Sequence, residues 1–371
     1  MAELFIGLMS GTSMDGVDGV LADFSTSTPT VLGHTSAALP PTLKSELLAL
    51  NLPGSNELHR AALAANALMR IYAGVVEQLL SKASVSPFHI AAIGAHGQTV
   101  RHQPQRFDGS GYTLQLANPA LLAELTQIEV VADFRSRDVA AGGQGAPLVP
   151  VFHQAFFGKP GETITVLNIG GMANLTVLGP KLADDVLGFD CGPGNALMDA
   201  WCLRHLDQPF DANGAWAASG QIQPGLLQAM LAEPFFAAPP PKSTGRDLFN
   251  PEWLERQLDG FFDVTPADVQ ATLTELTAST CATCVKDFGA ESKQLIVCGG
   301  GAFNAHLMAR LQALLPDMAV SPSNQHGLPA QQVEATAFAW LARKTIRREA
   351  LSLQNITGTR GARVLGAIYP A

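Results

Sequence analysis

Apolar and polar positions near the N-terminus follow the pattern of a β-hairpin. Residues 4–9 and 17–22 are apolar and compatible with strands, and residues 10–16 between them are rich in Ser, Gly and Asp. Two such runs around a turn-rich segment predict a strand, a turn and a returning strand. A second hairpin of the same plan is predicted from strands at 163–169 and 175–178 around the turn 170–174.

The other apolar segments alternate between helix and strand patterns. Residues 57–81 carry apolar side chains at helical spacing, including Leu63, Leu68 and Val75, and predict a core helix. Further helices are predicted at 195–205, 273–288 and 331–347, and short buried strands at 90–94, 128–132, 186–189 and 295–298. Strands that alternate with helices indicate an α/β fold.

The length of 371 residues predicts two lobes. The Gly- and Pro-rich run 140–147 resists both helix and strand, so we place the boundary there. The N-terminal lobe is then residues 1–140 and the C-terminal lobe residues 141–371, with the extreme C-terminus able to return to the first lobe. A Pro-rich loop is predicted at 237–243.

Composition argues against several classes of protein. Hydrophobic residues make up 47% of the chain, but charged residues interrupt every apolar stretch before it reaches the ~20 residues of a membrane span. The first residues lack the features of a secretory signal, so we expect a cytoplasmic protein that binds no membrane. A net charge of -9 argues against nonspecific nucleic-acid binding.

The five cysteines are odd in number and scattered, which predicts reduced thiols rather than a disulfide framework. Cys281 and Cys284 form one CxxC pair inside a helical run, with no second pair. Packing is therefore favoured over zinc binding at this pair.

Three glycine-rich turns, at 7–18, 170–174 and 299–304, each follow an apolar strand. Glycine lets backbone N–H groups approach and surround a phosphate. One such turn alone favours an ordinary hairpin, and the first lacks the GK[ST] of a Walker A loop, but three together favour a phosphate clamp. The residues assigned to the nucleotide are Gly11, Thr12, Ser13, Met14, Asp15, Gly16, Val17, Asp18, Gly170, Gly171, Asn174, Gly299, Gly300 and Gly301.

Asp15 and Asp18 are candidate ligands for Mg²⁺, because magnesium prefers oxygen ligands and keeps several waters in phosphate sites. An Asp in a tight turn also bonds its own backbone, which leaves turn capping as the alternative for Asp15. Asp18 falls within the predicted returning strand, which favours the metal role.

Asp190 follows a predicted strand and precedes a Gly-Pro-Gly turn and a helix. Active sites of α/β proteins collect at such strand ends. A carboxylate held there can act as general base toward a hydroxyl or a water. Capping of the following helix by Asp190 or Asn195 is the alternative.

A polar pocket is predicted if two strand ends adjoin, since one is followed by His96 and Gln98 and the other by Arg135 and Arg137. Arginine binds carboxylates and phosphates in a bidentate manner, so the pocket would suit an anionic, hydroxyl-rich small molecule. A surface ion-pair network is the alternative. Glu334 lies in an apolar helix, where a solvated flank is the simpler reading.

With these motifs in place, the chain resembles the superfamily of sugar kinases, heat-shock chaperones and actin, whose two lobes each carry a phosphate-binding hairpin. It resembles most closely the anhydro-N-acetylmuramic acid kinase family. The segments that carry this resemblance are 6–18, 94–99, 133–135, 168–174 and 189–195. The resemblance implies a two-lobed, actin-like ATPase fold with mixed sheets and a nucleotide cleft between the lobes.

The resemblance also implies an activity. ATP would phosphorylate O6 of 1,6-anhydro-N-acetylmuramic acid while water opens the anhydro ring, giving N-acetylmuramic acid 6-phosphate in cell-wall recycling. Asp190 takes the place of the family's catalytic base and Glu334 that of a sugar contact. Cys191 stands where Thr is more usual, which leaves a possible hydroxyl contact in doubt.

A homodimer is implied by the resemblance alone. Two other functions stay open: a conventional kinase on a free sugar hydroxyl, and an actin-like ATPase that acts as a nucleotide switch.

Overall fold

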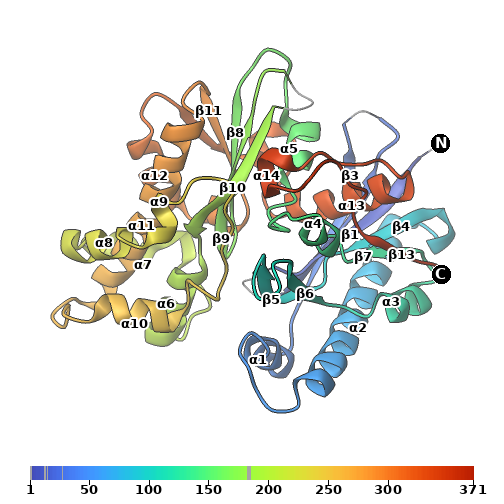
Figure 1. The fold of residues 1–371 in the computed structure, drawn as a ribbon, viewed down its shortest axis with the longest axis horizontal. Helices are drawn as coiled ribbons and strands as arrows, with labels where there is room; N and C mark the ends of the chain where they lie inside the picture. The colour runs from blue at the N-terminus through green and yellow to red at the C-terminus, as the bar shows by residue number, and fades with distance from the viewer. Residues whose placement is uncertain (1, 12–13, 15, 27, 182–184) are drawn as a thin grey trace. The chain divides into compact units, whose positions relative to one another are not determined.

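The computed structural model describes residues 2–11, 14, 16–26, 28–181 and 185–371, so the predicted site residues Thr12, Ser13 and Asp15 lie outside the described residues. The chain divides into two compact units (Figure 1). Unit 1 comprises Met1–Phe156 and Gln331–Ala371, and unit 2 comprises Phe157–Ala330. Among the described residues, every helix is too short or too polar to cross a lipid bilayer.

Unit 1 is built on a mixed sheet. Its described strands form a sheet in the order β13-β7-β4-β1-β2-β3 and a separate pair, β5 and β6. The strands are β1 (Leu4–Met9), β2 (Gly16–Asp23), β3 (Thr30–Ala38), β4 (Ile90–Ala95), β5 (Gln98–Pro104), β6 (Gly111–Leu116), β7 (Val130–Ala132) and β13 (Ala367–Tyr369). The helices are α1 (Pro41–Ala49), α2 (Glu57–Ala83), α3 (Pro119–Thr126), α4 (Ser136–Ala140), α5 (Pro150–Phe157), α13 (Val333–Ile346) and α14 (Gln354–Thr357).

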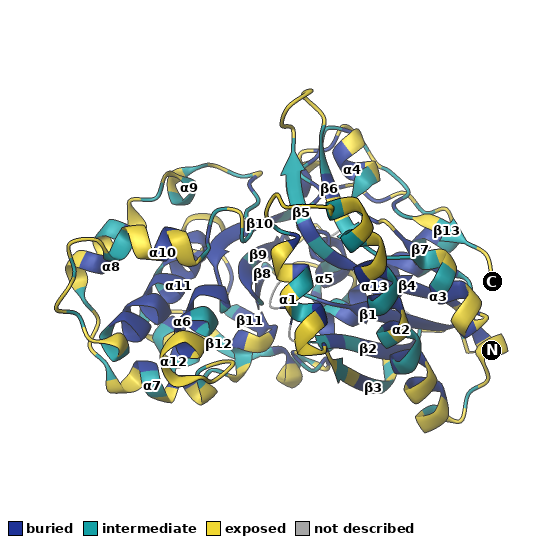
Figure 2. Cartoon of the chain, turned by 90° about the horizontal axis from the view of Figure 1, so that it is seen from below, coloured by how far each residue is buried: buried dark blue, intermediate teal, exposed yellow. Residues whose placement is uncertain are grey.

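Unit 2 holds the second mixed sheet, in the order β10-β9-β8-β11-β12 over its described residues. The strands are β8 (Ile164–Ile169), β9 (Met172–Leu178), β10 (Val186–Pro193), β11 (Gln294–Cys298) and β12 (Ala319–Pro322). The helices are α6 (Ala196–Leu206), α7 (Ala215–Ser219), α8 (Pro224–Leu231), α9 (Pro234–Ala237), α10 (Pro251–Leu258), α11 (Pro266–Phe288) and α12 (Ala305–Leu314). Figure 2 shows α11 as largely buried, in agreement with its long run of buried residues.

The two sheets repeat one plan. In each sheet, three strands that are consecutive in sequence pair antiparallel: β1, β2 and β3 in unit 1, and β8, β9 and β10 in unit 2. The first of these three strands also pairs with a parallel strand, which pairs with a further parallel strand. These are β4 and β7 in unit 1 and β11 and β12 in unit 2. Parallel strands end at the same edge of a sheet, so the segments that follow β1, β4 and β7 are collected in one place. The α/β class, the mixed sheets and the repeated hairpin are thereby confirmed, and the cleft between the lobes stays a prediction.

Glycines allow α13 to pack directly on the sheet of unit 1. A Cβ atom on Gly7 of β1 would overlap the Ala335 carbonyl oxygen, and one on Gly94 of β4 would overlap that of Phe338. Side chains alternate between the faces of a strand, and Gly19, paired with Leu8, faces Val75 of α2. The two helices therefore cover opposite faces, and every residue of β1 and all of β4 except Ala91 are buried, as their apolar sequences predict.

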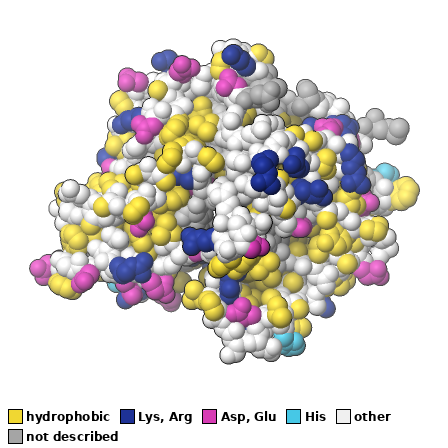
Figure 3. All heavy atoms as spheres, viewed as in Figure 1, with side chains coloured by type: hydrophobic (Ala, Val, Ile, Leu, Met, Phe, Trp, Pro, Cys, Tyr) yellow, Lys and Arg dark blue, Asp and Glu magenta, His cyan; other side chains and the backbone are white. Residues whose placement is uncertain are grey.

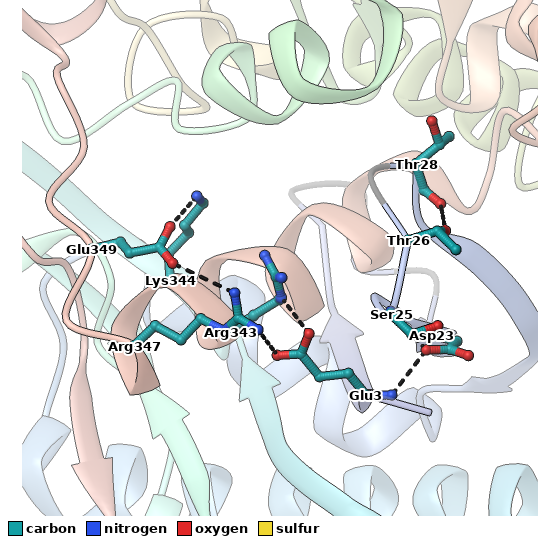
Figure 4. Close-up of polar contacts among 9 residues, drawn as sticks. All are labelled: Glu3, Asp23, Ser25, Thr26, Thr28, Arg343, Lys344, Arg347 and Glu349. Carbon is teal, nitrogen blue, oxygen red and sulfur yellow. Dashed lines mark hydrogen bonds and ion pairs between the residues drawn. The ribbon is translucent and has the colours of Figure 1, made fainter. Parts of the chain in front are cut away.

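An ion-pair network fixes the C-terminal part of α13 to the start of the chain (Figure 4). Glu3 accepts from Arg343 Nε at 3.1 Å and from Arg347 at 2.8 Å, and Glu349 pairs with Lys344. Figure 3 shows basic side chains gathered on one part of the visible surface. Arg343, Lys344 and Arg347 are each paired with Glu3 or Glu349, which argues against an open anion-binding face at this end of α13.

The predicted lobe boundary after residue 140 differs from the observed division, which falls after Phe156. The Gly- and Pro-rich run lies within unit 1, because the buried carboxylate of Asp138 holds it. Asp138 accepts from Gly145 N at 2.7 Å and from the Thr357 hydroxyl at 2.8 Å. The C-terminal return is also longer than expected, since all of residues 331–371 belong to unit 1.

The close packing of α13 predicts a large effect of one methyl group. We expect Gly94→Ala to lower the free energy of unfolding by about 3 kcal/mol, because the neighbouring atom is backbone and cannot rotate away. Gly74→Ala in α2 is the matched control, since its Cβ would have nothing within 4 Å and should stabilise the helix by about 1 kcal/mol. Urea unfolding measures both. Equal stabilities of the two variants would contradict this packing.

Candidate functional site

Buried hydrogen bonds fix the described part of the first glycine-rich turn. The fully buried Ser10 hydroxyl donates to Gly97 O at 3.0 Å and lies 3.0 Å from the Tyr72 hydroxyl, which then donates to it. Gly11 O accepts from Met14 N at 3.1 Å and from Gln98 Nε2 at 3.1 Å. Gln98 was assigned to the substrate, and the structure places its side chain against Gly11 of the first glycine-rich turn.

His96 and Arg135 meet, as predicted from the two strand ends. His96 Nδ1 lies 2.7 Å from Gly97 O and must donate to it, and Nε2 then accepts from Arg135 at 2.9 Å. Arg135 also donates to Gly145 O at 2.8 Å. Burial, and secondly the nearby guanidinium, lower the pKa of His96 to about 3. His96 is therefore a neutral group of defined tautomer that orients Arg135.

Arg137 is separated from this pair. It is exposed in α4, while the next residue, Asp138, is buried and holds the 140–147 run. Burial raises the pKa of Asp138, against the hydrogen bonds that it accepts. Of the two candidate arginines, only Arg135 is joined to His96 by the described contacts.

Glu334 lies in the first turn of α13, partly buried. Phe338, four residues later on the same face of the helix, packs its ring 4.7 Å from the His96 ring. The glycine-dependent packing of α13 therefore brings Glu334 to the side of the sheet where His96 and Arg135 lie, more than 190 residues away in sequence. The interpretation of Glu334 as a solvated residue on the flank of its helix did not include this proximity.

Asp18 lies in β2, as predicted, with its side chain 44% exposed and its carboxylate 3.3 Å from His34 Nε2. Among the described residues no cluster of three or more His, Cys, Asp or Glu side chains could hold a metal ion. One accessible carboxylate fits a magnesium ion that keeps most of its waters.

A row of polar side chains crosses the sheet of unit 2. Asp190 of β10 pairs with Asn174 of β9, and Asn174 pairs with Asn168 of β8. Residues directly opposite in neighbouring strands share one face. Asn174 was expected in the turn, but the turn is shorter and Asn174 lies within β9. Its Oδ1 atom is buried with no hydrogen-bond partner among the described residues.

Asp190 lies inside β10 rather than after a strand end, because the strand continues to Pro193. It is 5% exposed, and its Oδ2 accepts from Thr244 N at 2.9 Å. Its neighbour Phe189 packs 4.9 Å from Phe288 of α11, so alternation turns the Asp190 carboxylate to the face away from α11. Asp190 caps no helix by these contacts.

The turns of unit 2 converge on the end of β8. The first N–H groups of α6, at Asn195 and Ala196, donate to the carbonyls of Gly170 and Gly171 at 2.8 and 3.1 Å. Asn195 makes no side-chain cap, which removes the capping alternative for it. A Cβ on Gly299, whose φ is +79°, would lie 2.6 Å from Ile169 O. Only glycine lets the third turn lie so close to the second.

Gly300 and Gly301 also lie where the third glycine-rich turn packs against neighbouring segments of unit 2. A Cβ on Gly300 would lie 3.4 Å from Asn195 Nδ2, and one on Gly301 would meet the Ile169 side chain. The third turn then continues into α12, which Asn304 caps by accepting from Leu307 N at 3.0 Å. The second and third turns and the segment after Asp190 therefore form one region of unit 2.

The sequence did not reveal the residues that hold the Asp190 segment. Thr277 of α11 donates to Pro193 O and Gly194 O at 3.0 and 3.1 Å, and the Thr244 N–H reaches Asp190. A Thr inside a helix and a backbone N–H in a loop carry no recognisable motif. The Pro-rich loop was the one visible signal near Thr244.

The five cysteines, all within the described residues, are buried and form no disulfide bond. Cys191 lies against Cys281 and Cys284, and the hydrogen bond with Cys281 is the largest cause that raises the pKa of Cys191. The pKa of Cys284 is raised as well, chiefly by its hydrogen bond with Cys191 and then by burial, so Cys191 and Cys284 pack as neutral thiols. The expected packing role of the CxxC pair is consistent with this arrangement, and no metal-binding cluster occurs among the described residues.

Comparison with known proteins gives full-length matches. The family model described as "Anhydro-N-acetylmuramic acid kinase" matches residues 3–371. A protein of that name from Albidiferax ferrireducens is 66% identical, covering 100% of both chains, and one from Variovorax paradoxus is 64% identical, covering 100% of this chain and 99% of the relative.

Solved structures give a remote match. The activator of 2-hydroxyisocaproyl-CoA dehydratase from Clostridium difficile, with bound ADPNP, aligns with a TM-score of 0.49 and 13% identity over 94% of this chain and 96% of that chain.

The buried neutral histidine predicts a pH-dependent stability. The pKa of His96 is about 3 in the fold and about 6.5 when unfolded, so the unfolded chain binds one more proton in between. The stability contributed by neutral His96 is present above pH 6.5 and is lost as the pH falls toward 3. His102 and His153 are shifted in the same direction, to about 4 and about 3.

His96→Gln isolates this effect, because the other two histidines remain. We expect the stability advantage of the parent protein over the variant to shrink by about 1.4 kcal/mol per pH unit between pH 6 and pH 4. Urea unfolding at several pH values measures the difference. A constant difference would show that His96 is not held neutral.

Proposed function

The chain belongs to the anhydro-N-acetylmuramic acid kinase family, and from this premise we propose how it acts. It is a kinase that uses ATP to phosphorylate O6 of 1,6-anhydro-N-acetylmuramic acid while water opens the anhydro ring. The product is N-acetylmuramic acid 6-phosphate, and the pathway is the recycling of peptidoglycan. The observation that carries the residue assignment is the buried Asp190 carboxylate, held by Thr244 N at 2.9 Å.

Asp190 acts as the general base. It accepts a proton from the water that attacks the anomeric carbon C1, and the bond between C1 and O6 breaks. O6 takes the γ-phosphoryl group of ATP, which leaves ADP. Because phosphorus takes the place of a proton on the leaving oxygen, no second carboxylic acid is needed, unlike in ordinary glycosidases.

Each unit contributes its own part to nucleotide binding. In unit 1, the turn from Gly11 to Asp18 contacts the phosphates, and in unit 2 the second and third glycine-rich turns contact the nucleotide. Support comes from the close backbone approach that Gly299 permits and from the hydrogen bonds that hold Gly11. A magnesium ion held by Asp18, with Asp15 as the second predicted ligand, would neutralise phosphate charge.

The sugar is recognised by polar side chains of unit 1. Arg135 binds the lactyl carboxylate, His96 orients Arg135, and Glu334 contacts the sugar hydroxyls or amide. Support comes from the bond between Arg135 and His96 at 2.9 Å and from the packing of Phe338 on His96. The cytoplasmic location and the homodimer belong to this proposal, and size-exclusion chromatography with light scattering tests the dimer.

Replacement of the base should abolish turnover without abolishing binding. We expect Asp190→Asn to lower kcat about 10²- to 10⁴-fold, because the amide cannot accept the proton. Purified protein is incubated with Mg-ATP and the anhydro sugar, beside a panel of free amino sugars, and ADP release is followed. Full activity of the variant, or faster turnover of a free sugar, would overturn the proposal.

Replacement of Arg135 should remove discrimination for the carboxylate. We expect Arg135→Ala to raise the KM for the anhydro sugar about tenfold to hundredfold and to leave an analogue without the lactyl carboxylate nearly unaffected. Arg137→Ala is the matched control, since Arg137 is exposed and outside the His96 contact, and it should retain the parent KM. Unchanged discrimination in Arg135→Ala would rule out this contact.

A further inference from the structure

Lys242, in the Pro-rich loop after α9, is a buried lysine that the proposed function does not use. It is 8% exposed. Its ammonium donates to the carbonyls of Phe235 and Phe236, both at 3.1 Å, and lies 4.7 Å from the centre of the Phe235 ring and 5.9 Å from that of Phe189. The side chain therefore closes the loop back onto α9.

The folded-back loop provides the buried Lys242 ammonium with hydrogen-bond acceptors and aromatic contacts. An ammonium group removed from water is costly unless it is hydrogen-bonded, and aromatic faces add favourable electrostatic contact. The two carbonyls and the two rings supply both. Loss of the ammonium would leave two carbonyl groups without this donor, so the position of the loop depends on Lys242.

The same loop makes two hydrogen bonds to Asp190. The backbone carbonyl of Lys242 accepts from Asp190 N at 3.1 Å, and Thr244 N donates to Asp190 Oδ2 at 2.9 Å. β10 is the outer strand of its sheet, so the loop supplies what a neighbouring strand would supply elsewhere. Phe236, which shares the Lys242 contact, also packs over Gly192, where a Cβ would meet its ring at 2.6 Å.

We propose that Lys242 is a positioning residue for the reaction: by tying its loop to α9, it holds the Thr244 N–H on Asp190 and so fixes the direction of the carboxylate. The proposal rests on the proposed function of Asp190 as general base. It predicts an effect on the chemical step rather than on nucleotide binding, since the Lys242 contacts described above involve none of the glycine-rich turns.

Steady-state kinetics with Mg-ATP and the anhydro sugar test the proposal. We expect Lys242→Met to lower kcat about tenfold to hundredfold, as a small misplacement of a catalytic group does, while the KM for ATP stays within about twofold. Lys242→Arg keeps the charge and has N–H groups that can donate to the same carbonyls, so it should restore kcat to within about threefold. Lys286→Met, at an exposed lysine of α11, is the matched control and should retain parental kinetics.

A double-mutant cycle identifies the route of the effect. If Lys242 acts through Asp190, Lys242→Met should cause no further loss in the Asp190→Asn background. A folded Lys242→Met protein with parental kcat would overturn the proposal. So would an equal loss in both backgrounds, or a Lys242→Arg protein no better than Lys242→Met. Should Lys242→Met fail to fold, as judged by near-ultraviolet circular dichroism, Lys242→Gln takes its place in the same cycle.

Failure of this inference is distinguishable from failure of the proposed function. Full activity of Asp190→Asn would remove the base assignment whatever Lys242 does. Loss of activity in Asp190→Asn with parental kcat in Lys242→Met would leave the base in place and remove Lys242 alone.

Discussion

The contact of α13 with the backbone of β1 and β4 is the constraint on which unit 1 depends. It exists because Gly7 and Gly94 have no side chain. A Cβ atom at either position would overlap a carbonyl oxygen of α13. Through this contact residues 331–371 join the N-terminal sheet and cover its central strands. Phe338 is thereby placed against His96, and Glu334 lies one helical turn before Phe338, so segments from opposite ends of the sequence come together on this face of the sheet.

In unit 2, glycines likewise permit close backbone packing, here at the edge of the sheet. Gly299 and Gly301 allow the third turn to lie against Ile169 at the end of β8, and the carbonyls of Gly170 and Gly171 accept from the start of α6. The fixed backbone leaves few degrees of freedom for the face that carries Asn168, Asn174 and Asp190. Such preorganisation is what a proton transfer at a defined position needs.

Apolar periodicity was sufficient to predict the central elements. The hairpin of β1 and β2, the helix α2 and the strands β8 and β11 follow from runs that must be buried, and burial is readable in sequence. The lobe boundary was wrong, because a Gly- and Pro-rich run looks like a linker until Asp138 is seen to hold it. Long-range partners such as Thr357, Thr244 and Thr277 depend on tertiary packing, and single residues of these types carry no local signal.

We propose that Asp190 activates a water, not a sugar hydroxyl, while ATP phosphorylates O6. The most direct measurement is a reaction in H₂¹⁸O with early quenching and mass spectrometry of the phosphorylated sugar, beside finished product kept in the same water without enzyme. We expect one ¹⁸O atom at C1 and none in the phosphate. Product without label at C1 would contradict it, since the ring would then have opened without attack by water.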